Sequence, residues 1–106
     1  MGYRSDVYIK MNKNLKQEFL DKFLDDWKNI WRCSEDYEYY YVFIPHIKWY
    51  YSFPVVSDLS KWIINNKDNC GAIIIGEDYN TEQIGYPDEV GMYIRMDVEG
   101  FNYENQ

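Results

Sequence analysis

The stretch that decides the fold of this chain is Gly71-Ala72-Ile73-Ile74-Ile75-Gly76. Its central residues are all apolar, and a glycine bounds the run at each end. A strand with one face in water alternates apolar and polar residues, whereas a strand covered on both faces does not. We therefore expect residues 72–75 to form a buried strand near the centre of a sheet.

Other strand candidates lie on both sides of this run. Residues 7–11 and 92–98 alternate apolar and polar side chains, as half-buried strands do. Residues 37–53 are dense in Tyr, Val, Ile, Phe and Trp, which are enriched in strands. We expect a shorter strand over residues 82–86 and a turn over residues 87–91.

The aromatic segment of residues 37–53 contains a proline. Because proline cannot donate to a ladder, we expect either a hairpin turn at Pro45-His46 or a bulged edge strand. Neighbours on a strand point to opposite faces, so these aromatic side chains cannot all be core. If Tyr39, Tyr41 and Phe43 face the helices, then Tyr40, Val42 and Ile44 face the other way.

Two segments have helical periodicity. Asn14 can cap the first helix, with Gln17 completing a capping-box-like pair, and this helix is expected to run to about Trp31. Ser57 or Asp58 is expected to cap the second helix. Each helix has an apolar side, formed by Leu15, Phe19, Phe23, Trp27 and Ile30 in the first and by Val55, Val56, Leu59, Trp62, Ile63 and Asn66 in the second.

This order of elements predicts one α+β domain over residues 1–106. We expect a two-layer sandwich, with an antiparallel or mixed sheet of roughly four to six strands and both helices packed on one face. Residues 32–36 are expected to be a polar connection, and residues 102–106 to be a frayed tail. A chain of 106 residues with 46% apolar residues is long enough to bury a core.

Charge is segregated along the chain. Residues 1–53 carry equal numbers of basic and acidic side chains, so the net charge of -7 lies C-terminal to Phe53. After Lys67 the only cation is Arg95, against nine carboxylates: Asp68, Glu77, Asp78, Glu82, Asp88, Glu89, Asp97, Glu99 and Glu104. Such a surface repels nucleic acid and anionic membrane and attracts basic protein surfaces.

Several classes of function find little support in the sequence. The chain has no apolar run long enough for a membrane span and no signal-peptide pattern, so we expect a cytosolic protein. Its two cysteines, Cys33 and Cys70, are expected to be reduced thiols, and with a single histidine, His46, they do not make a zinc site. No motif for a nucleophile or a phosphate-binding loop is present, so we expect no catalytic residues and no cofactor.

The acidic segment of residues 77–82 shares some features with metal sites. Asp78, Asn80 and Glu82 have the spacing of the first ligands of an EF-hand loop, but the position that requires glycine is Gln83. The adjacent acids Glu77 and Asp78 end a strand, as Mg²⁺ ligands of nucleases do, yet few cations follow that could contact phosphate. We expect a solvated acidic turn and no metal.

Three segments resemble a known set of proteins. The opening Met1-Gly2-Tyr3-Arg4-Ser5-Asp6-Val7 resembles the start of a widespread set of small, mostly uncharacterised bacteriophage proteins, and Ile47-Lys48-Trp49-Tyr50 and Ile75-Gly76-Glu77-Asp78-Tyr79 are similar to its middle and late blocks. The resemblance implies a phage or prophage origin and expression in the host bacterial cytoplasm, and it brings no catalytic residues. Small acidic phage proteins are, as a class, often inhibitors of host defence, including anti-CRISPR and anti-restriction proteins whose carboxylates mimic DNA phosphates.

We therefore expect a non-enzymatic phage protein that binds the basic surface of a host protein, most concretely a nucleic-acid-binding component of a defence system. The expected partner-binding residues are Glu77, Asp78, Tyr79, Glu82, Tyr86, Asp88, Glu89, Tyr93, Asp97 and Glu99. Direct binding to nucleic acid or membrane is not expected. Two alternatives stay open: a small metal protein or enzyme that uses residues 77–82, and a homo-oligomeric phage assembly protein, for example a homodimer, that docks through residues 37–51.

Overall fold

The computed structural model describes residues 3–27 and 31–90, with the side chains of residues 88 and 89 left out. The α-helices and strands in this part are β1 (Ser5–Asn12), α1 (Lys16–Trp27), β2 (Arg32–Glu35), β3 (Tyr39–Ile47), α2 (Pro54–Asn65), β4 (Cys70–Gly76) and β5 (Thr81–Gly85). Two short 3-10 helices, η1 (Lys13–Leu15) and η2 (Pro87–Val90), follow β1 and β5. The final strand and tail expected after residue 91 lie outside the described residues.

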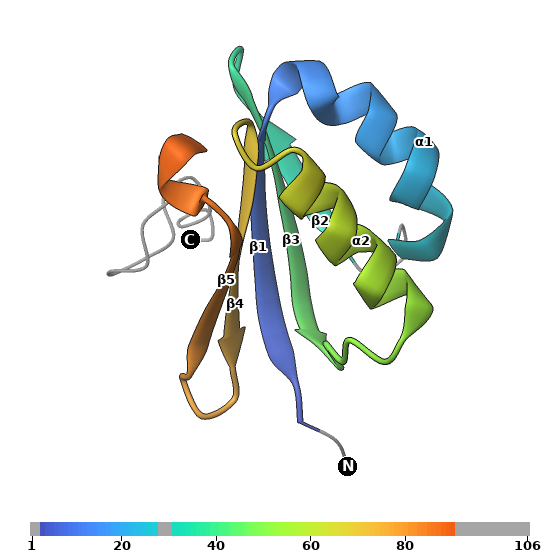
Figure 1. The fold of residues 1–106 in the computed structure, drawn as a ribbon, viewed down its shortest axis with the longest axis vertical. Coiled ribbons are helices and arrows are strands. Elements are labelled where there is room, and N and C mark those ends of the chain that lie inside the picture. Colours follow the sequence, from blue (N-terminus) through green and yellow to red (C-terminus); the bar gives the residue numbers. More distant parts are fainter. Residues whose placement is uncertain (1–2, 28–30, 91–106) are drawn as a thin grey trace.

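The strands form one antiparallel sheet in the order β2-β3-β1-β4-β5. Both helices lie on the same face of this sheet (Figure 1). The predicted α+β sandwich is therefore confirmed. Neither described helix is long and apolar enough to cross a membrane.

β4 is buried on both faces, as its uninterrupted apolar run predicts. Ala72 and Ile74 belong to the main core under the helices, whereas Ile73 packs with Val90 on the opposite face. β4 is an interior strand, but β1 occupies the centre of the sheet. Gly71 is needed because a Cβ there would overlap the backbone of Pro87.

The main core lies between the sheet and the helices. α1 contributes Phe19, Phe23 and Trp27, which recur along one side of the helix as the sequence predicts. α2 contributes its predicted apolar side together with one serine: Val56, Leu59, Ser60, Trp62 and Ile63 are buried.

The helix starts differ from the predicted ones. Asn14 does not cap α1; it lies in η1, where its N–H donates to the side chain of Asn12 (3.1 Å). α2 begins at Pro54, so the prediction that Ser57 or Asp58 caps it is wrong. Proline suits a first helical position because its missing N–H would have no partner there.

The face of β3 that packs against the helices is the opposite of the one considered from the sequence. Tyr40, Val42 and Ile44 are buried under the helices, and Tyr39, Tyr41 and Phe43 lie on the other face. Residues 32–35 form strand β2, so the prediction of a polar connection is wrong. All four β2 residues are exposed, and a strand without a buried face leaves no apolar alternation in its sequence.

Pro45 lies at a bulge and not in a hairpin turn. β1 and β3 change register where Asp6 opposes both Pro45 and His46. His46 has a positive φ of 54°, and its N–H donates to the Asp6 carboxylate (2.8 Å). β3 is not an edge strand, yet β2 pairs no further than Phe43, so the missing N–H of Pro45 breaks no ladder on that side.

Candidate functional site

The turn that joins β4 to β5 presents three of the expected partner-binding residues. Gly76 accepts a hydrogen bond from the N–H of Tyr79 (2.9 Å) and donates its own N–H to the carbonyl of Asn80 (2.8 Å). These two bonds define a three-residue hairpin loop, Glu77 to Tyr79, whose last residue is left-handed. Tyr79 has a φ of 67°, a position that usually holds glycine, and its side chain is 84% exposed.

Tyrosines from two other parts of the chain hold the carboxylates of this hairpin. The hydroxyl of Tyr3, just before β1, donates to Asp78. The hydroxyl of Tyr51, between β3 and α2, donates to Glu82 (2.5 Å). Gly76 makes the first contact possible, because a Cβ at this position would overlap the ring of Tyr3.

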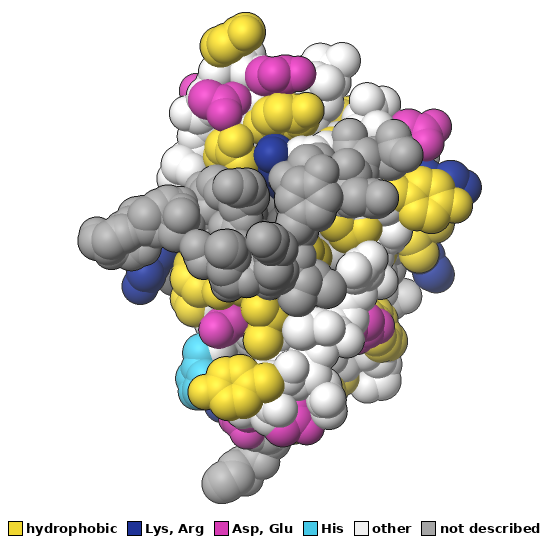
Figure 2. Space-filling view, turned by 90° about the vertical axis from the view of Figure 1, so that its left-hand side faces the viewer, with side chains coloured by type: hydrophobic (Ala, Val, Ile, Leu, Met, Phe, Trp, Pro, Cys, Tyr) yellow, Lys and Arg dark blue, Asp and Glu magenta, His cyan; other side chains and the backbone are white. Residues whose placement is uncertain are grey.

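The result is a compact surface at one end of the sheet. We call it the acidic–aromatic end and define it as Tyr3, Tyr51, Phe53, Glu77, Asp78, Tyr79 and Glu82. All of these side chains are exposed. Figure 2 shows Asp and Glu side chains beside hydrophobic ones at the lower end of the molecule, where Figure 1 draws the β4–β5 turn.

Hydrogen bonds and burial shift the pKa of two groups on this surface. The hydroxyl of Tyr3 and the N–H of Asn80 hold the pKa of Asp78 below its usual range. Burial, followed by the hydrogen bond to Glu82, raises the pKa of Tyr51 to about 12. At neutral pH the carboxylate of Asp78 is therefore ionised, while the hydroxyl of Tyr51 keeps the proton that it donates.

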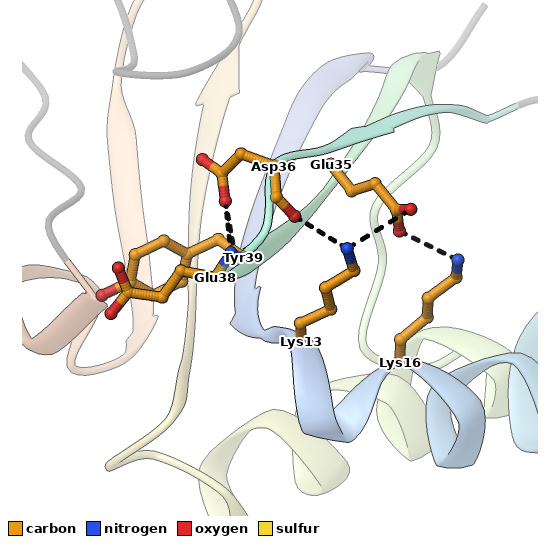
Figure 3. A network of polar contacts seen from close by, with 6 residues as sticks. All are labelled: Lys13, Lys16, Glu35, Asp36, Glu38 and Tyr39. Atoms are coloured by element: carbon orange, nitrogen blue, oxygen red, sulfur yellow. Dashed lines mark hydrogen bonds and ion pairs between the residues drawn. The ribbon is translucent and has the colours of Figure 1, made fainter.

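No ion pair neutralises these carboxylates within the part of the chain that the structure describes. The ion pairs found there join Glu35 to Lys13 (3.5 Å) and Lys16 (2.9 Å), at the opposite end of the sheet. Figure 3 shows this second network, in which Lys13 also donates to the carbonyl of Asp36 (2.9 Å). Acidic residues are thus paired at one end of the molecule and unpaired at the acidic–aromatic end.

The number of cations that follow the acidic segment in the sequence does not show which cations lie near it in the fold. Arg4 is far from the acidic segment in sequence, but its carbonyl accepts the N–H of Glu77 (3.0 Å). Its guanidinium is directed to the carbonyl of His46 (3.4 Å) instead of to a carboxylate. The small number of cations after Lys67 therefore does not keep basic residues away from the acidic segment in space, although its carboxylates have no ion pair among the described residues.

The predicted partner-binding residues that the structure describes lie near opposite ends of β5. Glu77, Asp78, Tyr79 and Glu82 lie together, whereas Tyr86 follows the other end of β5, where the Nζ of Lys67 lies 5.6 Å from the centre of its ring. Asp88 and Glu89 lie in η2, beyond Tyr86. Tyr93, Asp97 and Glu99 lie outside the described residues.

Sequence reasoning missed Tyr3, Tyr51 and Phe53 as members of this surface. They come from other segments, and no local pattern connects them to residues 77–82. The one usable signal is Gly76, since a glycine at a strand end often marks a close approach by another part of the chain.

The alternative of a metal protein or enzyme depends on Glu77, Asp78, Asn80 and Glu82. The described residues contain no group of three or more His, Cys, Asp or Glu side chains placed to hold a metal ion. Asp78 already accepts hydrogen bonds from Tyr3, from the N–H of Asn80 (3.1 Å) and from the Asn80 side chain (2.8 Å). These contacts favour the interpretation of an ordered acidic turn.

The thiols and the histidine lie apart from this surface. Cys33 is exposed on β2 and Cys70 is buried on β4, and both are free, as predicted. Burial raises the pKa of the Cys70 thiol, which lowers its thiolate content at neutral pH. His46 is exposed in the β3 bulge.

The outer face of the sheet has its own aromatic cluster. Tyr8 stacks on Phe43, with ring centres 4.8 Å apart. Lys10 is only 7% exposed, and its Nζ lies 4.3 Å from the ring centre of Tyr39 and 5.4 Å from that of Tyr41. Tyr39 and Tyr41, which belong to the segment of the homodimer alternative, are therefore engaged in contacts within this face.

No protein-family model, curated protein or solved structure matches this chain.

Proposed function

We propose that this protein is a non-enzymatic binding protein whose acidic–aromatic end docks on a basic surface of a partner protein. One observation carries the proposal: the carboxylates of Glu77, Asp78 and Glu82 have no cationic partner among the described residues, and tyrosine hydroxyls hold two of them in place. An ordered, unpaired carboxylate loses little side-chain entropy when a cation binds it.

The exposed rings suit the same partner. Tyr79 projects from the hairpin, and Tyr3, Tyr51 and Phe53 are each at least 40% exposed. Arginine forms bidentate hydrogen bonds with carboxylates and also stacks on aromatic faces. A surface that combines carboxylates with exposed aromatic rings therefore favours arginine-rich partners. Tyrosine is also common among the interface residues that contribute most of the binding energy.

The most concrete form of this proposal is inhibition of a bacterial defence complex. Proteins that act on nucleic acids carry basic grooves, and an anionic surface can occupy such a groove in place of phosphates. The resemblance of residues 1–7, 47–50 and 75–79 to small phage proteins supports a host protein in the bacterial cytoplasm as the target. Anti-CRISPR and anti-restriction proteins, including DNA mimics, are the classes that this proposal names.

Charge reversal at the acidic–aromatic end tests the proposal. A partner recovered from host lysate with the intact chain would be titrated with the triple variant Glu77→Lys, Asp78→Lys and Glu82→Lys. We expect about a hundredfold weaker binding and a smaller dependence of affinity on salt concentration, because close charge pairs across an interface each contribute about 1 kcal/mol or more.

A matched variant controls for net charge. Asp21, Asp25 and Asp26 lie exposed on α1, and changing all three to Lys alters the net charge by the same amount. The control is expected to bind nearly as well as the unaltered chain. Equal losses in the two variants would show that only overall charge matters, and no loss in the first would remove the acidic–aromatic end as the interface.

A further inference from the structure

β5 lies at the edge of the sheet. Among residues 3–27 and 31–90 it pairs only with β4. The bond between the Gly76 N–H and the Asn80 carbonyl sets which residues bond across this pair. Because hydrogen-bonded pairs alternate in an antiparallel ladder, Glu82 and Ile84 bond to β4, while Thr81 and Gln83 direct their N–H and C=O groups outward. Such an edge can accept another strand.

A groove runs along this edge, between β5 and the overlying helix α2. It has a volume of about 400 Å³. Its walls include Tyr51, Ser57, Lys61 and Ile64 on the helix side and Glu82 and Ile84 on the strand side. Ile64 is half exposed although it is a large apolar residue, so the groove offers apolar surface between a carboxylate and an ammonium group.

One buried polar atom in this groove lacks a partner. Ser60 lines the groove from α2, and its side chain is only 7% exposed. Its Oγ makes no hydrogen bond in the described structure. Buried hydroxyl groups are almost always hydrogen-bonded, so a polar atom of a ligand in this groove would supply the partner that Ser60 Oγ lacks among the described residues.

We infer that this groove binds an extended segment of the partner protein, which adds to β5 as a further strand. The segment would bond to the outward groups of Thr81 and Gln83, as in recognition by strand addition. The unpaired carboxylate of Glu82 selects a Lys or Arg side chain, and Ile64 with Ile84 selects an apolar side chain. Side chains two residues apart share one face of a strand, so the recognised pattern is a basic residue two positions from an apolar one.

This inference rests on the proposed function for the basic character of the partner, but it concerns a different contact. The acidic–aromatic end supplies charge at the hairpin, whereas the groove supplies backbone hydrogen bonds and an apolar pocket along β5. Glu82 and Tyr51 belong to both contacts, whereas the outward backbone groups of Thr81 and Gln83 belong to the groove alone. Strand addition can therefore fail while docking at the hairpin persists.

The substitution Gln83→Pro tests strand addition through a single backbone donor. It removes an N–H that points away from β4, so the β4–β5 ladder should survive. The probe is the synthetic peptide acetyl-Thr-Arg-Thr-Val-Thr-Val-amide, titrated into the ¹⁵N-labelled full chain. We expect shifts at residues 57–64 and 81–85, and about tenfold weaker binding by Gln83→Pro, which loses one backbone hydrogen bond to the peptide.

Gln83→Ala is the matched comparison, because it removes the side chain and keeps the N–H. Since Gln83 also lines the groove, we expect Gln83→Ala to weaken peptide binding less than Gln83→Pro does. A peptide with Glu in place of Arg should bind more weakly to both. Unchanged peptide binding by a folded Gln83→Pro variant would overturn strand addition, as would the absence of any shift at residues 81–85.

Two further outcomes distinguish strand addition from docking at the acidic–aromatic end alone and from self-association. If Gln83→Pro keeps full affinity for the host protein while the triple charge reversal abolishes it, the proposed function stands and strand addition falls. If the unaltered chain forms a dimer in light scattering that Gln83→Pro converts to a monomer, the occupant of the edge is a second copy, which also overturns the inference.

Discussion

At the scale of single residues, Tyr79 combines an unfavourable backbone with an exposed ring. A left-handed conformation brings Cβ close to the following carbonyl, at a cost of roughly 1–2 kcal/mol for residues other than glycine. The ring of Tyr79 is 84% exposed, so packing offers little compensation. Strained residues that persist without a structural gain often serve function.

The substitution Tyr79→Gly separates these two contributions. We expect the free energy of unfolding, measured in urea, to rise by about 1 kcal/mol, because glycine adopts a positive φ at little cost. Partner binding should weaken in the same variant. Tyr79→Ala is the control: it loses the ring but keeps the strained backbone, so it should gain no stability. A loss of stability in Tyr79→Gly would show that the ring contributes contacts to the fold.

Ser60 provides a second prediction for a single residue. Replacing it with alanine removes a buried hydroxyl that has no partner, so the free energy of unfolding should rise by about 1 kcal/mol. Peptide binding in the α2–β5 groove should weaken. Since alanine also favours helices, the half-exposed Ser57→Ala on the same helix measures that effect alone. A Ser60→Ala variant no more stable than Ser57→Ala would contradict an unpartnered hydroxyl.

At the scale of elements, the β2–β3 turn depends on one carboxylate. Asp36 accepts hydrogen bonds from the N–H groups of Glu38 (2.9 Å) and Tyr39 (2.7 Å) and from the hydroxyl of Tyr41 (2.8 Å). These bonds, led by that of Tyr39, hold the pKa of Asp36 below its usual range. The turn positions β2, which has no buried side chain of its own.

Acid should therefore weaken this turn. A carboxyl group whose pKa is lowered by folding stabilises the folded state above the unfolded pKa of about 3.9, and this stabilisation is lost as the pH falls through the folded pKa. We expect Asp36→Asn to show a smaller fall in the free energy of unfolding between about pH 5 and pH 2. Urea titrations at several pH values measure this, and identical profiles for the two proteins would refute it.

At the scale of the whole molecule, charge is divided between two ends of one sheet. Glu35 is paired with lysines of η1 and α1, while Glu77, Asp78 and Glu82 have no ion pair within the described structure. Within the described part of the C-terminal third, Glu77, Asp78 and Glu82 lie together at the β4–β5 hairpin, while η2 contains two further acidic residues. In the described residues, part of the acidic excess of the C-terminal third is therefore localised on one anionic surface at the hairpin.

The success of the sequence-based predictions followed from burial. β4, the apolar sides of both helices and the strand at residues 5–12 are visible as patterns because one or both faces are buried. β2 is exposed throughout, and the faces of β3 depend on which side the helices cover, so neither could be predicted from local pattern. The start of α2 was missed because the helix begins at Pro54, ahead of the serine and aspartate that the sequence offered as caps.

The amino-acid sequence by itself determined the fold class, the buried central run and an acidic hairpin after Gly76, because periodicity and charge are local properties. The tertiary structure alone decided which residues surround that hairpin. Tyr3 and Tyr51 reach Asp78 and Glu82 across 75 and 31 positions of sequence. Among the described residues it also placed β5 at the edge of the sheet with a groove beside it, since the order of strands depends on long-range packing that no single segment encodes.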